Sequence, residues 1–66
     1  MQIDIYADPS GSKRLVDHDT KVVLATFYDS DFLTLFLAGV AMRPGVKVFD
    51  VDSGLYLVGQ LSDLVL

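Results

Sequence analysis

The sequence contains no cysteine and no glutamate, and each absence narrows what the protein can be. Without cysteine, neither a disulfide nor a thiolate metal site can stabilise the fold. All nine acidic residues are aspartate, whose short carboxylate favours helix caps and turns over exposed helical faces. We therefore expect a chain with little solvated helix surface.

Positive charge is also scarce. The chain has five Lys and Arg residues and a net charge of −4, and the scattered positions of its cations argue against direct binding to nucleic acid. The first residues lack the positive and then apolar regions of a secretory signal. The longest apolar run, residues 32–42, is shorter than the roughly 20 residues that a membrane-spanning helix needs. We expect a cytoplasmic protein that contacts neither nucleic acid nor a membrane.

The apolar content is high for so short a chain. Hydrophobic residues make up 52% of 66 positions, which is enough for a single domain over residues 1–66. A domain of this size buries only about 60% of the surface that its unfolded chain exposes. The sequence therefore carries more apolar surface than one small domain easily hides.

The first half of the chain predicts two strands and a loop. Ile3 and Ile5 alternate with polar residues, which is typical of a half-buried strand. The polar residues 8–20 begin with a run of turn formers and predict a flexible loop. Residues 21–28 are rich in β-branched and aromatic side chains, and they predict a buried, central strand.

Residues 29–42 are compatible with two structures. Asp29 or Ser30 can cap a helix that Pro44 would end, and the leucines, alanines and methionine between them favour helix. In the alternative, residues 29–31 form a hairpin loop and residues 32–38 form a strand. We favour the helix.

The last third predicts a β-hairpin over residues 46–60, with a glycine-containing turn, and an apolar tail or edge strand over residues 62–66. The resulting order is β-β-α-β-β. This order predicts an α+β domain with one apolar helix packed on a short antiparallel sheet. If residues 32–38 form a strand instead, the domain is all-β.

The predicted helix is apolar on every side, and such a helix must be covered on every side. Few other elements are available, so a second chain would have to cover part of it, unless the sheet and residues 62–66 wrap around the helix within one subunit. Gly39 would let a second backbone approach closely. The residues that we expect to bind a partner are Leu33, Phe36, Leu37, Gly39, Val40 and Ala41.

Three Asp-x-Asp pairs, at residues 17–19, 29–31 and 50–52, have a spacing found in calcium loops, but the closing glutamate of such a loop is missing. The weak metal candidates are Asp17, His18 and Asp19, because they include the only imidazole. His18 is also the only candidate general base, with Ser10 and Ser12 as distant nucleophiles. We expect no cofactor and no enzymatic activity.

These observations lead to one hypothesis and one alternative. The hypothesis is a small acidic protein–protein interaction module, an accessory or inhibitor protein of the kind that bacteriophages encode, which occupies a partner's surface as a homodimer or through its apolar helix. The alternative is a small cation- or ligand-binding domain that uses the Asp-x-Asp pairs.

Overall fold

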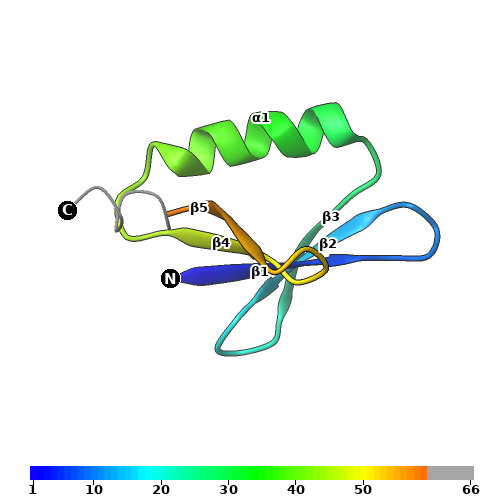
Figure 1. The fold of residues 1–66 in the computed structure, drawn as a ribbon, viewed down its shortest axis with the longest axis horizontal. Helices are drawn as coiled ribbons and strands as arrows, with labels where there is room; N and C mark the ends of the chain where they lie inside the picture. The colour runs from blue at the N-terminus through cyan, green and yellow to red at the C-terminus, as the bar shows by residue number, and fades with distance from the viewer. Residues whose placement is uncertain (60–66) are drawn as a thin grey trace.

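A computed structural model describes residues 1–59, so the predicted tail over residues 62–66 lies outside the described part of the chain. Within residues 1–59, five strands and one helix follow one another (Figure 1). They are β1 (Gln2–Ala7), β2 (Lys13–Asp17), β3 (Val23–Phe27), α1 (Ser30–Ala41), β4 (Lys47–Asp50) and β5 (Leu55–Val58).

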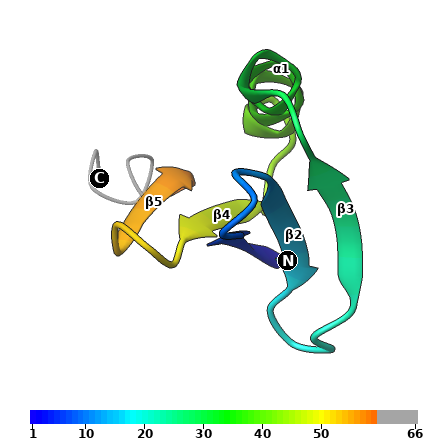
Figure 2. The same cartoon turned by 90° about the vertical axis from the view of Figure 1, so that its right-hand side faces the viewer.

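The strands form one sheet in the order β3-β2-β1-β4-β5, and α1 lies against one of its faces (Figure 2). Three pairs are antiparallel, whereas β1 and β4 run parallel. The α+β class is as predicted, but the prediction of a purely antiparallel sheet is wrong. The chain returns along α1 before it enters β4, and such a crossover connection joins parallel strands, which a tight hairpin cannot do.

Strand β2 lies inside the segment 8–20, for which the sequence predicted a flexible loop. Only Leu15 and Val16 are apolar in this strand, so its local pattern is weak. Both side chains are nevertheless buried, and that of Leu15 is fully inaccessible. The strand forms because β1 and β3 pair with it on both sides, an effect of tertiary context that outweighs local propensity.

Strand β3 lies at the edge of the sheet, although its apolar sequence predicted a central position. Val23 and Leu24 remain 49% and 46% exposed. The register with β2 shifts between Leu15 and Val16, where Ala25 and then Val23 are their partners. Leu24 is therefore the extra residue of a β-bulge.

The predicted helix is confirmed, and residues 32–38 do not form a strand. Asp29 is the N-cap, with φ −127° and ψ 125°, and its carboxylate accepts a hydrogen bond of 2.7 Å from the Asp31 N–H. This bond satisfies one of the free N–H groups of the first turn. Met42 is the C-cap. Within residues 1–59, no helix is long and apolar enough to span a membrane.

The predicted C-terminal hairpin is present as β4 and β5, whose antiparallel pairing lies within residues 47–58. Gly54 has a φ of 72° and donates a hydrogen bond of 2.8 Å from its N–H to the Asp50 carbonyl. Such a positive φ favours glycine, which has no Cβ to clash. Residue 60, the end of the predicted hairpin, lies outside the described residues.

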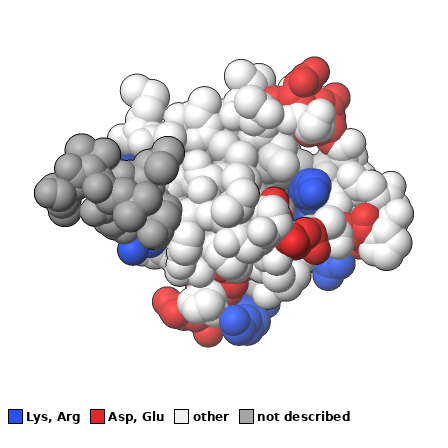
Figure 3. All heavy atoms as spheres, in the orientation of Figure 1, with Lys and Arg blue, Asp and Glu red and all other residues white. Residues whose placement is uncertain are grey.

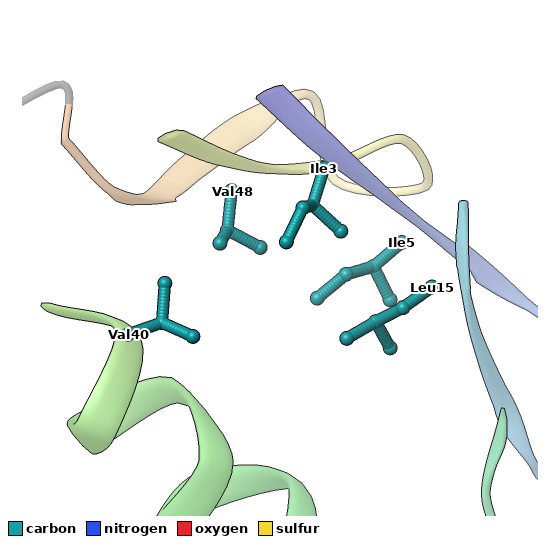
Figure 4. Packing of buried hydrophobic residues seen from close by; sticks show 5 residues of the cluster. All are labelled: Ile3, Ile5, Leu15, Val40 and Val48. Atoms are coloured by element: carbon teal, nitrogen blue, oxygen red, sulfur yellow. The ribbon is translucent and has the colours of Figure 1, made fainter. Parts of the chain in front are cut away.

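The core lies between α1 and the helix-facing side of the sheet. Ile3 and Ile5 of β1, Leu15 of β2 and Val48 of β4 point toward the helix, and Val40 points back at them (Figure 4). These five side chains come from three strands and the helix, so the core depends on the parallel pairing of β1 with β4.

Candidate functional site

One side of α1 packs on the sheet. We call it the inner stripe, and it consists of Leu33, Phe36, Leu37 and Val40. Val40 is buried, and the other three side chains are half-buried against the core. The Phe36 ring also contacts Phe27 of β3, with 5.3 Å between the ring centroids. The inner stripe attaches the helix to its own subunit.

A second side of α1, outside the inner stripe, is apolar and exposed. We call it the outer stripe, and it consists of Phe32, Leu35, Gly39 and Met42. Phe32 is 65% exposed, Leu35 is 68% exposed and Met42 is 85% exposed. No other described element lies over this side of the helix (Figures 1 and 2). Large apolar side chains that gather on one open surface mark interaction sites.

The structure divides the six predicted partner residues between different environments. Four of them form the inner stripe and pack within the subunit. Gly39 belongs to the outer stripe, and a Cβ built there would meet no atom within 4 Å. Ala41 is exposed at the end of the helix. The outer residues Phe32, Leu35 and Met42 were not among the six, because apolar residues on all sides of a helix do not indicate which side meets the sheet.

The surroundings of the outer stripe carry little charge, and that charge differs between the two ends of the helix. Between Lys21 and Arg43, the only charged residues are Asp29 and Asp31. In the view of Figure 3, the red atoms of acidic residues lie over the end where α1 begins. White atoms, which belong to uncharged residues, cover much of the rest of the molecular face in that view. Arg43 follows the other end of α1. The helix thus has an acidic start, an apolar middle and a basic residue beyond its end.

The edge of β3 that pairs with no described strand is a second exposed apolar surface. Val22, Val23 and Leu24 are each about half exposed, and no charged side chain lies in this strand. An edge strand of this kind can pair with another strand, but bulges weaken such pairing. The bulge at Leu24 therefore interrupts the regular hydrogen-bonding pattern along this strand, which makes its edge less suited to docking than the outer stripe.

On the other face of the sheet, Asp4 and His18 form a hydrogen-bonded pair. The Asp4 carboxylate lies 2.8 Å from the His18 Nδ1 and accepts a 3.0 Å bond from the Gln2 amide. Burial by itself would raise the pKa of Asp4, but hydrogen bonds from Gln2 and His18 outweigh it and hold this pKa below the ordinary value of 3.8. The pair therefore keeps a buried carboxylate charged.

This pair resembles the orienting half of a catalytic site, but the two candidate serine nucleophiles do not lie beside it. The Ser10 and Ser12 hydroxyls bond to each other at 3.2 Å. They precede β2, whereas His18 follows it, and a strand of five residues spans roughly 16 Å. The structure therefore does not bring the candidate nucleophiles together with His18.

The three Asp-x-Asp pairs share one local geometry. In each pair the first carboxylate accepts a hydrogen bond from the N–H of the second aspartate, at 2.9 Å for Asp17, 2.7 Å for Asp29 and 3.2 Å for Asp50. Asp17 also accepts from Thr20, and these backbone bonds hold its pKa below the ordinary value. The spacing thus builds turns and a helix cap. Residues 1–59 contain no group of three or more His or Asp side chains placed to hold a metal ion.

Comparison with known proteins gives no further assignment: no protein-family model, no curated protein and no solved structure matches this chain.

Proposed function

We propose that the protein is a small, non-enzymatic protein–protein interaction module whose contact surface is the outer stripe of α1. The observation that carries this proposal is the exposure of Phe32, Leu35 and Met42 on one side of the helix. Burying a fully exposed side chain of this kind stabilises a complex by about 1.5–3 kcal/mol, and most of the surface of these three side chains is still open. In this proposal the module acts by occupying the surface of a partner, as accessory and inhibitor proteins do.

The charges near the outer stripe define the kind of surface that fits it. Asp29 and Asp31 lie at the start of α1, and no cation lies between Lys21 and Arg43. A complementary partner therefore presents an apolar surface with a basic group near the start of the helix, because opposite charges across an interface favour one orientation.

The alternative function, cation binding by the Asp-x-Asp pairs, is favoured by no specific observation. The first carboxylate of each pair is already bonded to backbone N–H groups. Calorimetric titration with calcium, magnesium and manganese tests this alternative directly. Micromolar binding of any of these ions, with a rise in melting temperature, would establish it in place of the interaction surface.

The outer stripe is tested with two variants that add the same charge at neighbouring positions. Leu35→Asp places a carboxylate in the outer stripe, whereas Thr34→Asp places one on an exposed flank outside it. We expect Leu35→Asp to weaken any protein association at least tenfold, because a desolvated and unpaired charge is costly in an interface. Thr34→Asp should bind as the original chain does.

The measurement combines a photo-crosslinking residue at position 32 with affinity measurements on the captured protein. Circular dichroism must show that both variants keep the fold. Equal binding by Leu35→Asp and the original chain would contradict the proposal, since the stripe would then contribute nothing.

A further inference from the structure

We infer that the outer stripe of α1 binds the same stripe of a second copy of this chain, with the two helices antiparallel. This inference rests on the proposed function, because it names the partner of the same surface. It is drawn from the order of side chains and charges along the helix. When a second copy of the helix lies antiparallel to the first, this order places complementary groups opposite each other.

The self-complementarity is visible in the residue numbers. In an antiparallel pair whose centre lies level with residue 37, residue 35 is level with residue 39 of the second copy, and residue 32 is level with residue 42. Leu35 then lies over Gly39 of the second copy, where the absence of a side chain leaves room. Phe32 lies level with Met42 of the second copy, so large apolar groups meet at both ends of the contact.

The same alignment brings opposite charges together. Asp31 lies near the level at which the helix of the second copy ends, where Arg43 follows it, and by symmetry this occurs twice. The side chains of Asp31 and Arg43 form no ion pair with other residues in the described part of the chain, and both residues are exposed. An antiparallel arrangement also sets the positive start of each helix dipole beside the negative end of the other. A parallel arrangement would instead put Asp31 beside Asp31.

Gly39 fits this arrangement and has no evident role within the subunit. A Cβ at this position would meet nothing within 4 Å, and glycine inside a helix lowers helix stability relative to alanine. Close approach of a second helix gives the residue a function, because small residues at a crossing point let two helices pack tightly.

The contact is small, and the dimer is therefore expected to be weak. Only one helix per subunit takes part, and interfaces that bury less than about 1,200 Å² are typical of transient complexes. We expect a dissociation constant in the micromolar range, roughly 10–500 µM. Sedimentation equilibrium or light scattering over a wide concentration range measures it.

Charge reversal gives the sharpest test of the helix orientation. Asp31→Arg and Arg43→Asp each place like charges together at both ends of the contact, and each should weaken the dimer about three- to thirtyfold. The double variant restores both pairs in reversed form and should dimerise as the original chain does. An equimolar mixture of the two single variants should also form a heterodimer more tightly than either variant forms a homodimer.

Asp31→Arg also places a cation at the start of the helix, where it lowers helix stability. The double variant carries the same local defect, so recovery of dimerisation in it separates the interface from the stability of the subunit. A monomer at millimolar concentration, or a double variant that stays as weak as the single ones, would overturn the inference. If the chain is monomeric and Leu35→Asp still abolishes capture of another protein, the proposed function stands and the second copy is not the partner.

Discussion

At the scale of single residues, aspartate mainly shapes the backbone of this protein. Asp8, Asp17, Asp29 and Asp50 each accept a hydrogen bond from the N–H group two residues further along. Glutamate, which is one methylene longer, favours exposed helix positions over such turns. The all-aspartate composition thus reflects a fold made of short strands and turns with one helix. The presence of these turns follows from the sequence, but the 2.8 Å hydrogen bond that the Ala7 N–H donates to the distant Asp52 carboxylate does not.

Asp4 gives the first residue-scale prediction. Its folded pKa lies below the ordinary value of 3.8, so its contribution to stability is complete above that value and is lost as the pH falls through the lower folded value. Asp4→Asn should therefore reduce the free energy of unfolding by about 1–2 kcal/mol at pH 7. The difference from the original chain should shrink as the pH falls below ~4, because the unfolded chain takes up a proton at Asp4 before the folded chain does.

Urea unfolding at pH 7 and at pH 2.5, followed by circular dichroism, measures this difference. Asp19→Asn serves as the control, because Asp19 is an exposed residue of a turn. A loss of stability that is the same at both pH values would show that the charge of Asp4 is irrelevant and that only its shape matters.

At the scale of elements, the helix shows what local sequence can and cannot predict. Its start at Asp29 and its end before Pro44 follow from capping and breaking residues, whose effects are local. Its rotation about its own axis does not, because apolar residues surround it and only contact with the sheet distinguishes Val40 from Leu35. The sequence pattern did not predict β2 for a related reason. Its two apolar residues become a buried strand only because β1 and β3 pair with it on both sides. The sequence did contain one signal for the outer stripe. Asp31 and Arg43, the charged residues near the two ends of the helix, are exposed and so indicate the side that the sheet does not cover.

Gly39 gives a prediction in which two measurements move in opposite directions. Gly39→Ala should raise the free energy of unfolding of the subunit by about 0.5–1 kcal/mol, because alanine favours helix and its methyl group meets nothing. The same methyl group should weaken dimerisation severalfold, because it fills the space that Leu35 of the second copy would occupy.

Urea unfolding at a concentration where the chain is monomeric gives the free energy of unfolding, and sedimentation equilibrium gives the dissociation constant of the dimer. Ala38→Gly is the matched control, since it changes helix propensity by the same amount in the opposite direction at the preceding residue and lies outside the outer stripe. If Gly39→Ala leaves dimerisation unchanged, the second helix does not approach closely at this position.

At the scale of the whole molecule, the sheet is organised around β1. This strand pairs with β2 on one side and with β4 on the other, so it joins the first half of the chain to the last third. The sequence predicted the class of the domain and its C-terminal hairpin from local patterns. It could not predict the order of strands, because register between distant segments depends on which faces the helix covers. The edge position of β3 is an example, since apolar composition is the same for a central strand and for an edge strand that a partner could cover.

This organisation predicts a gradient of amide exchange. The hydrogen-bonded N–H groups of β1 should exchange only through global unfolding, because strands flank it on both sides. Those of β3 should exchange faster through local opening at the edge, by about tenfold or more. Hydrogen exchange followed by NMR at low protein concentration measures both rates. Equal protection of β3 and β1 under these conditions would show that the edge is covered in solution or that the sheet opens as one unit.

The parallel pairing of β1 with β4 also determines when the protein can fold during its synthesis. β1 ends at Ala7 and β4 begins at Lys47, so the ribosome must add some forty residues before the strand has its second neighbour, which takes roughly 2–8 s at typical elongation rates. Throughout that interval Ile3 and Ile5 lack the Val48 side chain, and for most of it they also lack the Val40 side chain, both of which later pack with them. The time for which the nascent chain stays exposed is thus set by topology, and it concerns the apolar face of β1 that the finished protein buries.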